Sequence, residues 1–180
     1  MIYIDMDDVL DNLTEAVIDE MNEEFGTDYN WEDSKCYWWL DTGRPQSYFE
    51  EVLCRKGIFR NAPTIKGAIE GVNDLKKHGF EVTFLTCPHY ENKYSANEKV
   101  EWLKEHFEWF DPYKHLICTN RKDLVGTQDD YLIDDNPNHL KNFRGVKICF
   151  ARRYNSGYQG VRLGYWEDVL NYIYKLEREY

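Results

Sequence analysis

Short apolar runs separated by helical patterns constrain the fold of this 180-residue chain more than any other feature. The apolar side chains of residues 66–78 share one helical face, and Gly79 ends that pattern. Ser95 and Glu98 predict a capping box at the start of a second helix. Strands that alternate with helices are typical of a parallel sheet covered by helices, which binds ligands beyond the carboxyl ends of its strands. We therefore predict an α/β fold with strands at residues 1–4, 80–85, 115–118, 131–133 and 146–150.

A stretch of about 60 residues between the first two strands interrupts this alternation. Apolar spacing predicts one helix from Leu13 to Phe25 and another around residues 48–53. Three of the six tryptophans lie between these helices, a density that a simple connection does not explain. We predict an inserted helical cap, hinged near Asn12 and near residues 61–63. The α/β core then comprises residues 1–13 and 76–180, and the cap residues 14–75.

The charge balance limits the partners of the chain. With 22 basic and 33 acidic residues, the formal net charge is -11, which argues against binding of nucleic acid polymers or anionic lipid. Five cysteines without a CxxC pair indicate reduced thiols, and no apolar run approaches the ~20 residues of a membrane span. We expect a cytoplasmic protein that acts on a small molecule.

Carboxylates follow two of the predicted strands. Asp5 and Asp7 come directly after the first strand, and positions two apart in extended backbone face the same way. Asp134 and Asp135 follow the fourth strand in the same manner. Either pair alone is more often a strand-end cap or turn. Together they indicate that two strands of one parallel sheet present carboxylates at the same edge.

A divalent cation explains this concentration of negative charge. An EF-hand calcium loop that begins at Asp5 fails, because Leu10 and Ala16 stand where Gly and Glu are needed. Magnesium binds through one or two carboxylates together with substrate phosphate and water. The sequence therefore predicts a Mg²⁺ site that includes both acidic pairs.

Two further residues complete a possible phosphate site. Thr86 ends the second strand and offers a hydroxyl and a backbone N–H, although a strand-end turn is its ordinary role. Lys122 could bring positive charge to the same anion, although most single lysines are solvated at the surface. With these groups, Asp5 could attack phosphorus as a nucleophile while Asp7 acts as general acid and base.

The order of these motifs resembles the haloacid dehalogenase superfamily of phosphotransferases. More specifically, DMDDVLDN resembles the DMDGVLADF opening of the 5'(3')-deoxyribonucleotidases, and IFRNAPTIKGAIEGVNDL resembles their segment after the cap. RKDLV and YLIDDNP resemble their DKTVV and LLIDDR. The similarity covers most of residues 1–150. It implies a Rossmann-like core with a small helical cap, and Mg²⁺-dependent removal of phosphate from deoxynucleoside monophosphates through an aspartyl-phosphate.

The resemblance also implies roles for individual residues. Asp5 corresponds to the nucleophile and a metal ligand, and Asp7 to the acid/base whose backbone carbonyl also binds metal. Asp134 corresponds to the remaining protein ligand, with Asp135 beside it. The implied phosphate-binding residues are Thr86, Cys87 and Lys122, and Lys99 matches a family lysine near the substrate.

Three positions depart from the family pattern. Asp8 stands where Gly is usual, Cys87 where Ser or Ala is common, and Asn136 where Arg often follows the acidic pair. None of these departures removes a catalytic group. Asp8 adds a side chain and negative charge next to the phosphate site.

Aromatic residues of the predicted cap are candidates for binding the leaving group, because stacking on a nucleobase contributes about 1–3 kcal/mol per base. The same rings could instead form the core of the cap or a dimer contact, and the chain could be a monomer or a homodimer. The candidate substrate-binding residues are Lys99, Tyr37, Trp38, Trp39, Tyr48 and Phe49.

Three alternatives to a nucleotidase remain. The chain could hydrolyse another small phosphomonoester with the same groups, or be a catalytically silent phosphate-binding protein. A receiver-type signalling module is less compatible, because its phosphorylated Asp should end the third strand, where Cys118 and Thr119 stand.

Overall fold

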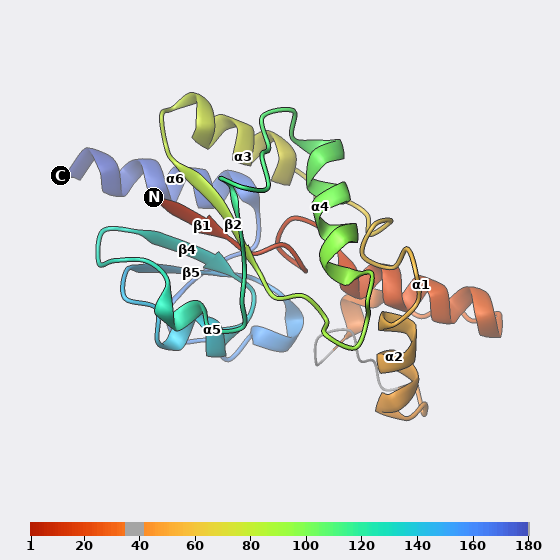
Figure 1. Cartoon of the computed structure of the whole chain (residues 1–180). Helices are drawn as coiled ribbons and strands as arrows, with labels where there is room; N and C mark the ends of the chain where they lie inside the picture. Colours follow the sequence, from red (N-terminus) through yellow and green to blue (C-terminus); the bar gives the residue numbers. More distant parts are fainter. Residues whose placement is uncertain (35–41, 180) are drawn as a thin grey trace.

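The computed structural model describes residues 1–34 and 42–179, which contain a six-stranded parallel sheet (Figure 1). Its strand order is β3-β2-β1-β4-β5-β6. The chain enters at the centre, builds one half of the sheet outward and then crosses to build the other half. The order therefore reverses between β1 and β4, where open α/β sheets bind ligands. The strands are β1 (Ile2–Ile4), β2 (Val82–Thr86), β3 (Leu116–Cys118), β4 (Tyr131–Asp134), β5 (Val146–Phe150) and β6 (Val161–Leu163).

Helices cover both faces of this sheet. Alternate residues along each central strand point to opposite faces, so Ile2 and Ile4 join one apolar cluster and Tyr3 joins another. Helices α3, α4 and α6 pack on the first face, and α5 packs on the second. The helices are α1 (Leu13–Phe25), α2 (Gln46–Leu53), α3 (Ala68–Lys77), α4 (Ser95–His106), α5 (Pro137–Lys141) and α6 (Trp166–Glu179), with short 3₁₀ turns η1 (Trp31–Asp33), η2 (Lys122–Leu124) and η3 (Arg153–Asn155).

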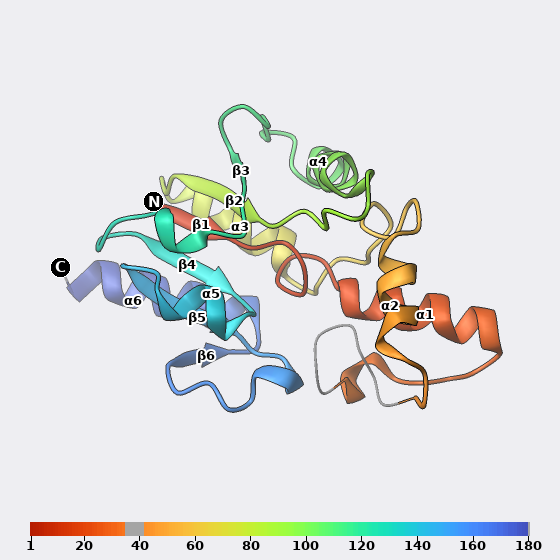
Figure 2. The same ribbon diagram turned by 60° about the horizontal axis from the view of Figure 1, so that its bottom comes forward.

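The predicted α/β fold is confirmed, with one strand missed. All five predicted strands are present within a residue or two of their expected bounds. The sequence analysis predicts no strand after residue 150, but Val161–Leu163 form β6, which pairs with β5 at the edge of the sheet (Figure 2). Unlike the predicted strands, β6 is not part of an apolar run, because Arg162 lies at its centre, and pairing with β5 stabilises it.

The predicted capping box at α4 is wrong. Ser95 is the first helical residue, and its Oγ accepts a hydrogen bond from the His89 backbone N–H at 2.9 Å. The Glu98 carboxylate binds the main chain of Gly57 and Phe59, far away in the sequence. A distant pair of backbone donors thus competes successfully for a side chain that the local pattern assigns to the helix start.

The helices α1 and α2 lie to one side of the sheet and have a core of their own (Figures 1 and 2). Val17, Met21, Phe49 and Val52 are fully buried in it. By contrast, α3 packs against α6 in the main cluster. The division into a core of 1–13 and 76–180 and a cap of 14–75 stays a prediction.

None of the helices within residues 1–34 and 42–179 is both long and apolar enough to cross a membrane. The four cysteines in these ranges, Cys54, Cys87, Cys118 and Cys149, are free thiols.

A substitution at Gly145 tests how closely the backbone packs in the turn before β5. A Cβ atom there would lie 2.0 Å from the Asp130 carbonyl oxygen and 2.7 Å from that of Thr127, so the backbone would have to shift. We expect Gly145→Ala to cost about 1–3 kcal/mol, as overpacking does, and to lower the melting temperature by several degrees. Gly157→Ala is the matched control, because nothing lies within 4 Å of its Cβ position. Equal melting temperatures for the two variants would contradict this packing.

Candidate active site

Pairing between β1 and β4 brings two aspartates together at the carboxyl edge of the sheet. Ile4 is in register with Ile133, and the Asp5 N–H donates to the Ile133 carbonyl at 2.9 Å. The next residues are Asp5, which is 5% exposed, and Asp134, which is fully buried. Lys122 Nζ lies 2.8 Å from Asp5 Oδ1 and 2.7 Å from Asp134 Oδ2. A buried ammonium group thus bridges the two carboxylates.

These charges determine each other's protonation. Burial raises the pKa of Asp5 to about 6, the carboxylates of Asp134 and Asp7 also raise it, and Lys122 opposes the shift. Burial would likewise raise the pKa of Asp134, but Lys122 and His139 outweigh it and hold that pKa below the usual value. The pKa of Lys122 is raised, because the two carboxylates more than compensate for its desolvation.

A second buried lysine, Lys99, pairs with Asp7. Lys99 on α4 is 1% exposed, and its Nζ donates hydrogen bonds to Asp7 Oδ1 and, at 3.1 Å, to Thr86 Oγ1. Burial alone would lower the pKa of Lys99, but Asp7 and Asp11 raise it above the usual value. Lys99 therefore belongs to the same charged cluster as the predicted catalytic residues, at the end of β2.

His139 joins the cluster, although sequence reasoning missed it. Its Nδ1 lies 3.2 Å from both carboxylate oxygens of Asp134. Three potential ligand atoms lie within 4.8 Å of one another, one from each of Asp5, Asp134 and His139. The ligands of a divalent metal ion are similarly close together. Pro137 is typical of the first turn of a helix and could have indicated this position of His139. In the first turn of α5, residue 139 lies next to the end of β4.

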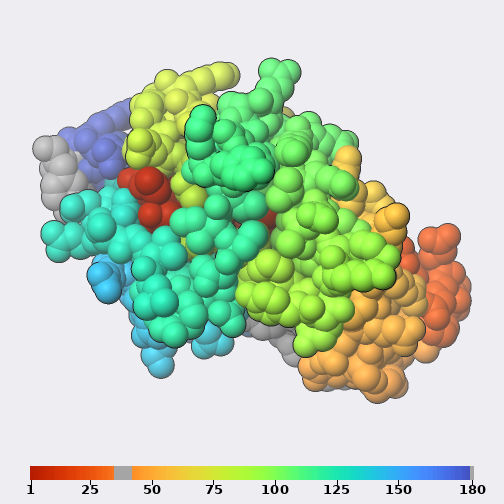
Figure 3. Space-filling view, in the orientation of Figure 1, coloured from red at the N-terminus to blue at the C-terminus, as the bar shows by residue number. Residues whose placement is uncertain are grey.

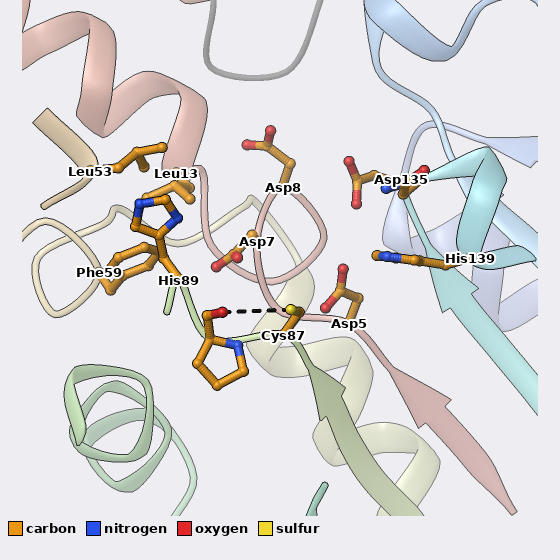
Figure 4. Close-up of a pocket in the computed structure, with 12 residues that line it drawn as sticks. Asp5, Asp7, Asp8, Leu13, Leu53, Phe59, Cys87, His89, Asp135 and His139 are labelled. Carbon is orange, nitrogen blue, oxygen red and sulfur yellow. Dashed lines mark hydrogen bonds between the residues drawn. The ribbon is translucent and has the colours of Figure 1, made fainter. Parts of the chain in front are cut away.

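A pocket opens over this cluster and has two chemically different sides (Figure 4). Asp5, Asp135 and His139 lie on one side, and Asp7 and Cys87 lie between the sides. The other side is largely apolar, with His89 as its polar group. It is formed by Leu13, Leu53, Phe59 and His89.

Tyr48 and Phe49, two of the aromatic candidates from the predicted cap, do not face the pocket. Phe49 is fully buried in the α1–α2 core, and the Tyr48 hydroxyl donates to Glu24 at 2.9 Å. Among residues 1–34 and 42–179, Phe59 is the Phe, Tyr or Trp side chain that lines the pocket. Tyr37, Trp38 and Trp39 lie outside the described residues.

Sequence comparison gives consistent results over the whole chain. Residues 1–178 match the profile of a family described as 5' nucleotidase, deoxy (pyrimidine), cytosolic type C. A Staphylococcus epidermidis protein provisionally named 5'(3')-deoxyribonucleotidase is 32% identical over 181 residues, which cover 98% of this chain and 97% of that protein. The 5'(3')-deoxyribonucleotidase of Clostridium acetobutylicum is 32% identical over 123 residues, 66% of this chain and 63% of that protein.

The chain belongs to the 5'(3')-deoxyribonucleotidase family. It is therefore a phosphoric monoester hydrolase of the haloacid dehalogenase superfamily, which confirms the predicted family and enzyme class. A HAD family hydrolase from Deinococcus radiodurans R1 has the same fold, with a TM-score of 0.66 and 12% identity over 97% of this chain and 94% of that chain.

The structure explains why this deoxyribonucleotidase-family chain tolerates Asp8 in place of the usual Gly. Asp8 has a φ of 58°, in the left-handed region that favours Gly and that Asp adopts more readily than most residues. Its carboxylate accepts hydrogen bonds from the N–H and hydroxyl of Thr14 in the first turn of α1. The added charge is thus bound at a helix N-terminus, where negative charge is stabilising.

Two residues of the segment after β5 support the same corner of the site. The Arg152 Nε donates to the Asp8 carbonyl at 2.8 Å. The Tyr154 hydroxyl lies 2.9 Å from Asp8 Oδ2 and 2.5 Å from Asp135 Oδ2. Burial, followed by Asp134, raises the pKa of Asp135 well above its usual value. Sequence reasoning assigned no role to this segment, because nothing local indicates that it folds back to the start of the chain.

The other two departures, Cys87 and Asn136, also line the pocket. The Cys87 thiol lines the pocket and donates to the Pro88 carbonyl at 3.5 Å. Burial raises the pKa of this thiol, which keeps it protonated. The side chain of Asn136 accepts from the Asn138 N–H and caps α5, while its own N–H donates to Asp134 Oδ1 at 2.8 Å.

Asp11 offers a test of the electrostatics. It is 2% exposed, and its Oδ1 has no hydrogen-bond partner within the part of the chain that the structure describes. Burial, followed by repulsion from Asp7, raises its pKa well above that in the unfolded chain. The folded state therefore holds a proton that the unfolded state releases, and Asp11 destabilises the fold increasingly as the pH rises above about 4.

We expect Asp11→Asn to be more stable than the wild type at about pH 8, by roughly 1–3 kcal/mol, and similar to it at about pH 4. Thermal unfolding of both proteins at the two pH values measures this difference. A gain that is equal at both values, or larger at the lower one, would contradict the assigned protonation.

Proposed function

We propose that this protein is a Mg²⁺-dependent phosphatase that hydrolyses (deoxy)nucleoside monophosphates through an aspartyl-phosphate on Asp5. One observation carries the proposal: Lys122 bridges the carboxylates of Asp5 and Asp134, and Asp5 lines a pocket together with Asp7. The names of the related proteins support the substrate class. We propose that the protein acts on such a nucleotide in the cytoplasm, as a monomer or homodimer.

The donor atoms fit the proposed metal. Mg²⁺ prefers oxygen ligands and usually keeps several waters, so the carboxylates of Asp5 and Asp134 with the Asp7 carbonyl suffice for the protein's share. His139 is close enough to bind the ion or a carboxylate ligand. When bound, Mg²⁺ would neutralise part of the phosphoryl charge and orient its oxygens.

Asp5 and Asp7 have separate roles in the proposed reaction. The Asp5 carboxylate attacks phosphorus and the bond to the leaving oxygen breaks, while the Asp7 carboxyl gives that oxygen a proton. Asp7 then takes a proton from water, whose oxygen attacks the phosphorus of phospho-Asp5. Phosphate leaves and Asp5 is restored. General acid–base catalysis of this kind contributes about 10²–10⁴-fold.

Positive charge and hydrogen-bond donors would hold the phosphoryl group next to Asp5. Lys122 already contacts Asp5 and has the compact charge suited to a phosphate oxygen. Thr86 offers its hydroxyl and Cys87 its backbone N–H at the end of β2. Lys99, which the sequence placed near the substrate, would hold Asp7 and Thr86 in place through its two hydrogen bonds.

The apolar side of the pocket is the proposed site of the leaving nucleoside. Phe59 supplies a ring on which a base can stack, and Leu13 and Leu53 extend the apolar wall. His89 is the polar group available on that side. Phe59 thus takes the part that the sequence assigned to Tyr48 and Phe49.

The nucleophile is tested by Asp5→Asn, since an amide cannot attack phosphorus. We expect turnover to fall by at least ~10³-fold, measured as phosphate release. Asp19→Asn, on the exposed face of α1, is the control and should leave the rate unchanged. Normal turnover by Asp5→Asn would refute the mechanism.

A panel of substrates tests metal and substrate together. We expect deoxynucleoside monophosphates to release phosphate faster than sugar phosphates when Mg²⁺ is present. Chelation should lower the rate on the order of 100-fold or more, and added Mg²⁺ should restore it. Faster hydrolysis of the sugar phosphates would favour the alternative phosphomonoesterase, and a rate insensitive to chelation would refute the metal. The absence of repeated turnover on every substrate would favour a silent binding module.

A further inference from the structure

Side chains of the β2–α4 region hold the main chain of residues 53–62, which leads from α2 back to the sheet. Glu98 accepts hydrogen bonds from the N–H groups of Gly57 at 2.6 Å and Phe59 at 3.3 Å. The Asn92 amide donates to the Leu53 carbonyl at 2.7 Å, and Trp102 Nε1 donates to that of Ala62 at 2.9 Å. Figure 3 shows the orange segment with α2 lying against the green segment around the start of α4.

Glu98 is the charged member of this set. Glu98 is 5% exposed, and each of its two carboxylate oxygens accepts a hydrogen bond from one backbone N–H. Hydrogen bonds to an ionised acceptor are about twice as strong as neutral ones. Gly57 has a φ of 95°, a conformation open to Gly, and this turn directs both N–H groups toward the carboxylate.

The next residue on α4 serves the phosphate side of the pocket. Lys99 binds Asp7 and Thr86, and its Nζ also lies 4.9 Å from the centre of the Phe59 ring. The Phe59 ring, on the apolar side of the pocket, therefore borders the charged cluster. Consecutive residues of one helix thus fix the reacting groups and the opposite wall separately.

We propose that Glu98 is a positioning residue for the leaving group: by holding the N–H groups of Gly57 and Phe59, it fixes the Phe59 ring against which the leaving nucleoside packs. The phosphoryl chemistry depends on Lys99 instead. The proposal rests on the proposed function for the identity of the leaving group, but the anchoring of residues 57–59 does not.

Glu98→Gln separates the two roles, because an amide has one acceptor oxygen and cannot bind both N–H groups. The KM for a deoxynucleoside monophosphate should rise roughly tenfold, the equivalent of one lost charged hydrogen bond. With acetyl phosphate, whose small leaving group has no ring, kcat/KM should stay within about twofold. Glu101→Gln is the control, since Glu101 lies on the same helix but is exposed and pairs only loosely with Arg60 at 3.6 Å.

Two further measurements keep the proposal testable if Glu98→Gln is poorly folded or inactive. Hydrogen exchange at the amides of residues 57–59 should be faster in Glu98→Gln and unchanged in Glu101→Gln. Phe59→Leu, which keeps an apolar side chain, should reproduce the rise in KM for the nucleotide with little change for acetyl phosphate.

The outcomes distinguish this inference from the proposed function. Equal losses with both substrates would show that Glu98 acts through Lys99 or the fold, and unchanged exchange would show that it does not anchor the segment; either result overturns the inference. A wild type that cleaves acetyl phosphate but no nucleoside monophosphate would instead refute the proposed substrate.

Discussion

The burial of carboxylates at the carboxyl edge of the sheet is the constraint on which the site depends. Asp5 and Asp134 are brought together by the register of β1 and β4, in surroundings from which water is largely excluded. Uncompensated, such charges would cost several kcal/mol each, so cations must accompany them. Lys122 lies between these two aspartates, and Lys99 binds Asp7. In the proposed mechanism, the same cations attract the anionic substrate toward Asp5.

The pocket has a second wall because a helical insertion returns to the sheet beside the charged cluster. That wall is held by hydrogen bonds between side chains of α4 and the preceding loop and the main chain of residues 53–62. Buried backbone groups in such a segment need partners, and here these partners also determine where Leu53 and Phe59 lie. Neighbouring residues of one helix, Glu98 and Lys99, thus contact the apolar wall and the charged cluster of the pocket.

The acidic cluster could be predicted from the sequence because a parallel sheet aligns the ends of its strands. Asp5, Asp134 and Thr86 each end a strand, so their convergence follows from strand identification alone. His139 was missed, because its position depends on the first turn of α5, for which Pro137 was the local signal. Phe59 could not be distinguished from Tyr48 and Phe49, since helical spacing predicts burial but not which ring faces the pocket. Glu98 was misassigned because its partners are about 40 residues away.

The central claim is that Asp5 carries the phosphoryl group during turnover. Rapid quenching of the enzyme with its substrate and Mg²⁺, followed by borohydride reduction, converts an acyl phosphate on aspartate to homoserine, which peptide mass spectrometry locates. The account predicts this product at position 5, dependent on substrate and on Mg²⁺. Reduction at any other residue, or its absence at position 5 while phosphate accumulates in a burst, would contradict it.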